Sequence, residues 1–312
     1  MKKNLFKILS LFVIIYFISG FILFPLFNLT SESFTNLSNL KEFFSNPNLY
    51  EAITNSLLLS VLSVVLSLIL GVYLAYLIHS YRIKLKSFLS AFILLPIATP
   101  PIIGTVAFVY LISDNGLIIK LVNNYFSFIK INPIQGWTAI LLIHLYSFYP
   151  FFFLFSSASL KKLDSNITDA SYSLGASKFK TLFKIIIPYL YPAIISSSVI
   201  VFMASMASFS APFIFGDNSR FLTTEIYNSK INGDMQFSSL LSIVLTFISL
   251  IGLYFFTKFR NLNENTSSSK GTIRLLSESG KSKLNLINKF FISSVIIFIS
   301  LPLITLIYLS FI

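Results

Sequence analysis

Few residue types in this chain can carry out covalent, redox or metal chemistry. The sequence contains no Cys, which excludes a thiolate nucleophile, a thiolate metal ligand and a disulfide within the chain. Its two imidazoles, His79 and His144, both lie beside apolar runs, a poor setting for a histidine-rich metal site or a general base. Paired carboxylates and the HExxH pattern are absent as well. We therefore predict no catalytic residue and no metal site.

One short sequence imitates a nucleotide-binding loop. Gly280, Lys281 and Ser282 match the end of a P-loop, where backbone N–H groups and a lysine hold phosphates. The first glycine of that motif would fall at position 275, which is Leu275, and no strand pattern precedes it. We predict that the chain itself binds no ATP and no other cofactor.

The stretch 169–188, DASYSLGASKFKTLFKIIIP, has the local signals of two short helices joined by a bend. Thr168 is predicted to cap the first helix, with Asp169 in its positive first turn. Gly175 permits the bend, Ser177 is predicted to cap the second helix, and Pro188 is predicted to mark the entry to the next membrane span.

The same stretch is unusually apolar for a loop. Phe179, Leu182 and Phe183 are spaced three and four apart, so they share one helix face. The small side chains of Ala170, Ser171, Gly175 and Ala176 favour close approach of another surface. We predict that this loop docks on a partner.

The elements that position this loop are membrane spans. Apolar residues make up 55% of the 312 residues and charged residues 11%, against about 45–50% and 25% in soluble domains. Stretches long enough to cross as helices occur at about 8–27, 54–78, 88–112, 137–159, 190–210, 238–257 and 290–312. The predicted fold is an all-α membrane protein.

The basic residues indicate the orientation of these spans. Of the 23 Lys and Arg residues, 18 fall on the side that holds the N-terminus, the 169–188 loop and segment 260–288. Because the cytoplasmic side carries the excess of basic residues, we predict a multi-pass membrane protein with a cytoplasmic N-terminus. Membrane topology also explains the net charge of +12, so nucleic acid is not a predicted partner.

Polar residues and prolines within the spans are candidates for a translocation path. Prolines in the third span break the helix and can expose backbone carbonyls, although a packing kink is an equal interpretation. Hydroxyls in the fourth and fifth spans can line a path, although in membrane bundles they more often serve packing. The candidates are Pro96, Thr99, Pro100, Tyr146, Tyr149, Ser208 and Ser210.

The spacing of the loop resembles a known pattern. Asp169-Ala170-Ser171, Gly175, nine residues to Ile185, one more and then Ile187-Pro188 are similar to the EAA loop of ABC transporter permeases of the binding-protein-dependent importer type. The family pattern has Glu, Ala and Leu where this chain has Asp169, Ser171 and Ile187. The resemblance implies a loop that couples the permease to an ATP-hydrolysing subunit, with Asp169, Ala170, Ser171, Gly175, Ala176, Ile185 and Pro188 as its coupling positions.

A second resemblance narrows the family. The segment 208–245, which contains LTTEIYN and GD, resembles the region of spans five and six in ferric iron permeases. Related segments occur in permeases for polyamine, thiamine and phosphonate. The resemblance implies a transport subunit of the bacterial inner (cytoplasmic) membrane without enzymatic activity, most similar to ferric iron permeases, with the other three substrates left open.

The layout predicts three parts. Residues 1–259 form a six-span permease unit, 260–288 a polar, Ser-rich cytoplasmic linker, and 289–312 a span that resembles the first one and begins an incomplete second half. The implied partners are ABC ATPase subunits, an extracytoplasmic solute-binding protein, a second permease half or a second copy, and the lipid bilayer.

A secondary transporter is the competing class of function. Proton- or sodium-coupled carriers usually place charged side chains within their spans. No Asp, Glu, Lys or Arg falls in the middle of any predicted span, and a secondary transporter does not account for the 169–188 loop. These two observations favour the importer.

Overall fold

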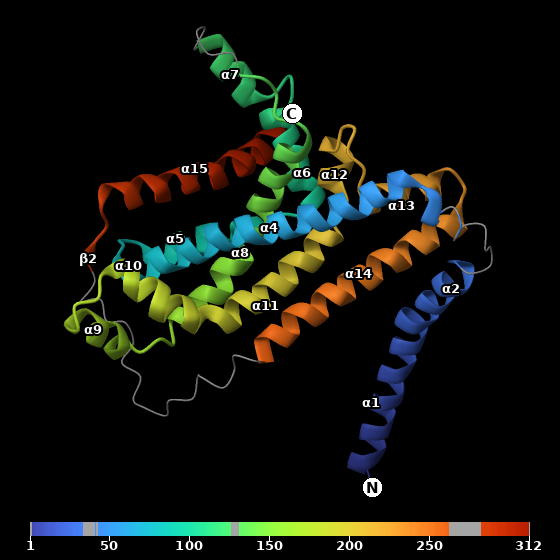
Figure 1. The fold of residues 1–312 in the computed structure, drawn as a ribbon, viewed down its shortest axis with the longest axis horizontal. Coiled ribbons are helices and arrows are strands. Elements are labelled where there is room, and N and C mark those ends of the chain that lie inside the picture. The colour runs from blue at the N-terminus through green and yellow to red at the C-terminus, as the bar shows by residue number, and fades with distance from the viewer. Residues whose placement is uncertain (1, 34–40, 42, 126–130, 262–281, 312) are drawn as a thin grey trace. The chain divides into compact units, whose positions relative to one another are not determined.

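The computed structural model describes residues 2–33, 41, 43–125, 131–261 and 282–311. These residues are mainly α-helical and divide into two compact units (Figure 1). The first unit contains 1–56 and 220–248, and the second contains 57–219 and 249–312, so the division falls within two long helices. Seven helical stretches of the described residues are long and apolar enough to cross a membrane, which confirms the predicted number.

The helices have the following bounds. In chain order they are α1 (Lys2–Ile18), α2 (Phe24–Ser33), α4 (Pro47–Ser80), α5 (Lys86–Leu94), α6 (Pro101–Ile112), α7 (Leu117–Tyr125), α8 (Gly136–Leu160), α9 (Ser165–Ser173), α10 (Lys178–Thr181), α11 (Ile187–Met206), α12 (Ser210–Phe215), α13 (Leu222–Ile231), α14 (Met235–Asn261) and α15 (Leu286–Leu309). Two-residue strands β1 (Tyr81–Arg82) and β2 (Ser282–Lys283) pair in parallel.

The second unit is built on the packing of α8 against α11, which lie side by side (Figure 1). A glycine lets α4 approach α8 closely, because a Cβ at Gly71 would collide with the carbonyl oxygen of Tyr149 and with Phe152. Ser60, Ser63 and Ser67 are buried on the same helix. Small residues at helix contacts are how membrane bundles gain van der Waals packing, since lipid gives no hydrophobic drive between helices.

Prolines shape two of the spans. The third predicted span, 88–112, is not one helix: α5 passes into a 3₁₀ turn (Leu95–Ala98), and Thr99 and Pro100 are extended before α6 begins at Pro101. The candidate span is Pro101–Tyr125, with Lys86–Ala98 as a shorter apolar helix. The predicted interruption by prolines is therefore confirmed, but the bounds of the span differ because the break divides it.

The fifth span begins earlier than predicted. The helix runs without a break from Lys178 through a π-helical segment, η3 (Leu182–Ile186), into α11. In η3 the Ile187 N–H bonds to the Leu182 carbonyl, a five-residue step. This extra residue falls directly before Pro188, which has no N–H and whose ring crowds the preceding turn. A π-helical segment, η1 (Ser19–Leu23), also precedes Pro25.

The first unit has an apolar core of its own. Leu49 and Ala52 from the start of α4 meet Leu222 of α13 and Phe237 and Leu241 of α14. Two long-range hydrogen bonds close this core: Ser56 Oγ accepts from the Leu222 N–H (2.9 Å), and the Asn55 amide donates to the Arg220 carbonyl (3.0 Å).

Helix α15 packs within the second unit, along α6. The Phe298 ring lies against Phe108 and Tyr146, and the Tyr73 hydroxyl donates to the Asn288 side chain (2.9 Å). Most of the predicted 260–288 linker lies outside the described residues. The division of the chain into a six-span unit, a linker and the start of a second half stays a prediction.

Candidate functional site

The stretch that resembles the EAA loop begins with a helix that starts earlier than expected. Asp164, not Thr168, caps α9: its carboxylate accepts a hydrogen bond from the Asn166 N–H at 3.0 Å. Thr168 lies one turn inside the helix and is buried. The prediction was wrong because Asp164 is an equally good capping residue and the sequence between the two is compatible with a helix.

The bend is a complete Schellman motif at Gly175. The Ala176 N–H bonds to the Ser171 carbonyl (3.0 Å) and the Gly175 N–H to the Tyr172 carbonyl (2.9 Å). Gly175 has φ +79°, the left-handed region that glycine adopts without strain, as predicted. Across the bend, the buried hydroxyls of Ser171 and Thr181 lie 2.8 Å apart and tie α9 to α10. The corner is thus held by hydrogen bonds.

The second helix starts where the sequence predicts. The Ser177 hydroxyl accepts a hydrogen bond from the Lys180 N–H (3.3 Å). Pro188, however, does not mark the entry to a span, because the helix that begins at Lys178 already continues through it. The second half of the loop, from Lys178 onward, and the fifth span are therefore one continuous helix.

An exposed apolar surface surrounds the bend. Leu174 is 88% exposed, Phe179 72% and Phe183 51%, and the rings of Phe179 and Phe183 lie 4.4 Å apart. Of the other predicted coupling positions, Asp169, Ala170 and Pro188 are exposed, Ala176 and Ile185 half-buried and Ser171 buried. We call Leu174, Phe179 and Phe183 the apolar corner.

The charge around the apolar corner is positive. Lys178, Lys180 and Lys184 are exposed, and the Lys178 ammonium lies 5.3 Å from the centre of the Tyr81 ring. Burial raises the pKa of the nearby Tyr172 phenol, and Tyr81 and Asp169 add to the increase, so this phenol is neutral at physiological pH. A partner surface complementary to the apolar corner and its lysines would be an apolar groove with acidic residues at its rim.

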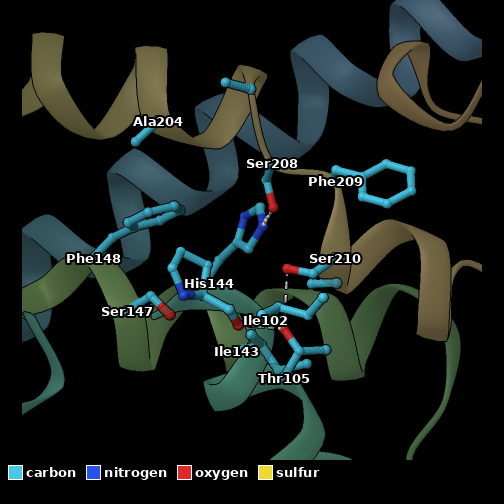
Figure 2. A pocket seen from close by; sticks show the side chains of 13 residues that line it. Ile102, Thr105, Ile143, His144, Ser147, Phe148, Ala204, Ser208, Phe209 and Ser210 are labelled. Carbon is cyan, nitrogen blue, oxygen red and sulfur yellow. Dashed lines mark hydrogen bonds between the residues drawn. The ribbon is translucent and has the colours of Figure 1, made fainter. Parts of the chain in front are cut away.

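A second candidate site is a mostly apolar pocket of about 400 Å³ within the second unit, which we call the polar pocket after the hydroxyls and the imidazole in its lining. Figure 2 shows His144 of α8 at its centre, with Ser147 and Phe148 from the same helix and Thr105 from α6. Ser210, the first residue of α12, and Ser208, from the link before that helix, complete the polar side chains. The His144 Nδ1 lies 2.8 Å from the Ser63 hydroxyl and 3.2 Å from that of Ser205, and its Nε2 lies 2.9 Å from that of Ser208. The Thr105 and Ser210 hydroxyls are 3.4 Å apart.

These contacts favour one neutral tautomer of the imidazole. If the Ser63 hydroxyl donates to the Leu59 carbonyl (2.7 Å), its oxygen is left to accept from an Nδ1–H of His144. The Nε2 lone pair then accepts from the Ser208 hydroxyl.

The structure brings together only part of the predicted path. Ser208 and Ser210 line the pocket, whereas Tyr149 is buried and donates to the Ile93 carbonyl (2.8 Å), and Tyr146 is buried against Phe108. Pro96, Thr99 and Pro100 form the break before α6, where the Thr99 hydroxyl donates to the Pro96 carbonyl (2.7 Å). A path role for all seven residues stays a prediction.

His144 was not among the residues predicted for the path. It was considered only as a metal ligand or general base, and its place beside an apolar run spoke against both roles. Among the described residues, no group of three or more His, Cys, Asp or Glu could hold a metal. The sequence did contain a signal for His144, namely its position within an apolar span. A single ionisable side chain inside an apolar span is costly and by itself suggests a functional position.

Comparison with known proteins decides the family. A family model for the inner membrane component of binding-protein-dependent transport systems matches residues 67–267. The chain belongs to this family. It is a multi-pass inner membrane protein, as predicted, and the EAA resemblance of its loop is in keeping with this membership.

Several relatives of this permease are similar over most of the present chain. A putative ferric transport system permease protein, FbpB 1 of Haemophilus influenzae, is 28% identical over 246 residues, 77% of this chain and 39% of the relative. The ferric transport system permease protein FbpB of Actinobacillus pleuropneumoniae is 30% identical over 70% of this chain and 32% of the relative. A spermidine/putrescine transport system permease protein PotC homolog of Mycoplasma genitalium is 27% identical over 67% of this chain and 69% of the relative.

The permease thus spans between about a third and two fifths of the length of the two ferric relatives. Among solved structures, it is similar to a chain of a bacterial alginate ABC transporter in complex with an alginate pentasaccharide-bound periplasmic protein. The TM-score is 0.71 at 16% identity, and the match covers 84% of this chain and 96% of that chain. At this identity the likeness concerns the fold, and it agrees with the predicted all-α permease bundle.

Proposed function

We propose that this chain is the transport subunit of an ATP-driven importer, in which its spans form part of the translocation path and the EAA-like loop couples them to a separate ATPase. The observation that carries the proposal is the apolar corner. Leu174, Phe179 and Phe183 project from a corner that Gly175 and two helix caps fix in place. Apolar side chains that are exposed to solvent in a fixed arrangement favour burial against a partner.

We propose that the partner hydrolyses ATP, because this chain has no complete nucleotide-binding motif. The nucleotide-like sequence at 280–282 lacks its first glycine, and Gly280 and Lys281 lie outside the described residues. The EAA-like loop continues into α11, whose residues Ala204 and Ser205 lie at the polar pocket and its imidazole. Movement of the docked loop would therefore be carried along one helix to the pocket.

The proposed path includes the pocket around His144. It offers hydroxyls and an imidazole in an otherwise apolar bundle, a suitable passing site for a small polar solute or an ion with oxygen ligands. A complete path also requires a second permease bundle, on the same or another polypeptide, and a solute-binding protein outside the membrane. The length of the ferric relatives supports the second bundle.

The proposed substrate is ferric iron. Its support is the resemblance of segment 208–245 and the names of two relatives, both ferric permeases. Polyamine is the second candidate, supported by a relative that covers a similar share of this chain. Thiamine and phosphonate remain as candidates from the segment's resemblance. We propose that the binding protein selects the solute, because the pocket holds a single imidazole and no carboxylate.

Uptake measurements test the substrate. A strain that lacks this gene is compared with its complemented form for uptake of labelled ferric iron, spermidine, thiamine and phosphonate. We expect loss of iron uptake alone, restored by the intact gene. Normal iron uptake together with loss of one of the other solutes would contradict the assignment while leaving the permease function in place.

His144 provides a separate test of the path. In the complemented strain, His144→Ala removes both hydrogen-bonding nitrogens, and we expect at least a tenfold fall in uptake with normal amounts of protein in the membrane. Tyr73→Phe is the control, since it removes a hydroxyl that bonds to Asn288 outside the pocket. Equal uptake in the two variants would exclude the pocket from the path.

A further inference from the structure

A second cavity lies where three helices of the second unit end or begin. It has a volume of about 520 Å³, within the range of about 300–1,000 Å³ that is usual for small-molecule sites. His79 comes from the last turn of α4, Lys86 from the first turn of α5, and Lys161 and Lys162 follow the end of α8. Because α4 and α8 are membrane-crossing candidates, the cavity lies at a membrane–water interface.

The cavity is strongly basic. Three lysines and a histidine line it, and its lining contains no Asp or Glu. Neither Lys161 nor Lys162 forms an ion pair in the part of the chain that the structure describes. The Lys86 ammonium lies 3.4 Å from Nδ1 of His79, which places one of the cations against the buried end of α4. Cations gathered in this way attract an anion.

Two further groups in the cavity lack the partner that an anion would supply. Ser157 is over nine-tenths buried, and its hydroxyl has no hydrogen-bond partner. An unsatisfied buried hydroxyl is costly, and a phosphate oxygen would accept its proton. The N-terminus of α5 has no side-chain cap, because Leu85 stands at the capping position, and Ser87 of its first turn lines the cavity. Helix N-termini attract phosphate oxygens through their free N–H groups.

The rest of the lining is mainly apolar. It includes Leu94, Phe153, Leu154 and Ala158, and Leu154 is exposed. A free anion gains nothing from contact with these side chains, whereas an acyl chain or glycerol backbone would cover them. The cavity therefore combines basic and hydrogen-bonding groups with apolar side chains, at the level where lipid headgroups lie.

We propose that this cavity binds an anionic phospholipid of the inner leaflet, with the headgroup phosphate between Lys86, Lys161 and Lys162 and a hydrogen bond from Ser157. The headgroup joins the link between α4 and α5 to the segment that leads from α8 into α9. Anionic lipid bound there holds together the two segments that flank the cavity. The inference does not depend on the transported solute.

Lipid binding to the purified full chain tests the proposal. The chain is placed in nanodiscs of phosphatidylcholine with phosphatidylglycerol added in increasing amounts, and bound phosphatidylglycerol is counted by native mass spectrometry. We expect specific binding of phosphatidylglycerol over phosphatidylcholine. Lys161→Gln with Lys162→Gln should weaken it about tenfold. Ser157→Ala, which changes no charge, should weaken it severalfold.

A matched variant separates this site from general attraction to charge. Lys120→Gln with Lys230→Gln also removes two exposed lysines but lies outside the cavity, and it should bind phosphatidylglycerol like the unchanged chain. Equal binding by both double variants would overturn the proposal, as would equal binding of the two lipids. If inorganic phosphate displaces phosphatidylglycerol at equal concentration, the site takes a free anion and the lipid assignment is wrong.

Discussion

Two helix corners of this permease share a backbone design and differ in what surrounds it. At Gly175 and at Gly233 a helix ends in a Schellman motif with φ +79° and +86°. A capping side chain, Ser177 or Asp234, follows at each corner and bonds to a backbone N–H of the next helix. A Cβ at either glycine would meet no atom of the chain within 4 Å.

The surroundings of the two corners are opposite. The Gly233 corner joins α13 to α14, whose Leu222, Phe237 and Leu241 are buried in the core of the first unit. At the Gly175 corner, the buried contact between the helices is the hydroxyl pair of Ser171 and Thr181, and the apolar corner is exposed. One corner thus contributes to a core of its own unit, whereas the other leaves three apolar side chains exposed, which agrees with the proposed docking of a partner.

The largest expected effect comes from removal of the apolar corner. Leu174→Ser with Phe179→Ser removes two side chains whose burial contributes roughly 1.5–3 kcal/mol each. We expect binding of the ATPase subunit to weaken over about a hundredfold and uptake to stop. Ile231→Ser with Met235→Ser, two exposed apolar residues at the Gly233 corner, is the control and should leave ATPase binding unchanged. Equal binding in the two variants would remove the distinction between the corners.

A bulky residue at each glycine has the next largest effect. Gly175→Leu and Gly233→Leu both place a side chain at positive φ, at a cost of about 1–2 kcal/mol each. Because the space at both positions is open within the chain, equal strain is expected. Transport-stimulated ATP hydrolysis should fall about tenfold for Gly175→Leu only. A similar fall for Gly233→Leu would assign the effect to strain alone and not to docking.

Substitutions at the Gly233 corner should lower the free energy of unfolding more than substitutions at the Gly175 corner, the reverse of the order expected for ATPase binding. Leu241→Ala leaves a cavity in the core of the first unit and should lower the free energy of unfolding of that region by about 2–4 kcal/mol. Ser171→Ala removes one hydroxyl pair and should cost about 1 kcal/mol. Hydrogen exchange of the amides in α13 and α9 measures both. If Ser171→Ala lowered the free energy of unfolding more than Leu241→Ala, the Gly175 corner would depend on more than its hydrogen bonds.

The smallest effect is expected at the caps. Asp164→Ala and Asp234→Ala each remove an N-cap hydrogen bond, of α9 and of α14, worth about 0.5–2 kcal/mol. We expect similar increases in local hydrogen exchange at the two helix starts. Markedly unequal increases would show that the corners differ in their backbone as well as in their surroundings.

Local signals predicted the Gly175 corner well because its chemistry is local. Gly175 and Ser177 act through their own backbone and the next turn, which the residue types specify. The cap of α9 was misplaced because Asp164 and Thr168 are both capable caps and the choice depends on packing. Pro188 was misinterpreted since a π-helical segment absorbs it without ending the helix.

The two cavities were beyond local reasoning. At the polar pocket His144 contacts Ser63 on one side and Ser205 and Ser208 on the other, so three segments that are far apart in the sequence meet. The basic cavity joins Lys86 to Ser157 and Lys161 in the same way. Only the packing of α4, α5, α8 and α11 determines which of the chain's many serines and lysines meet, and sequence patterns do not contain this information.

The central claim is that the apolar corner is the docking surface for an ATPase subunit. Its most direct test is a photo-crosslinking amino acid at Phe179 in the full chain, co-expressed with its ABC ATPase subunit in membranes that retain uptake. The same amino acid at Met235, at the Gly233 corner, is the control. We predict a crosslink to the ATPase from position 179 and none from position 235. Active transport without a crosslink at position 179, or with equal crosslinks at both positions, would contradict the claim.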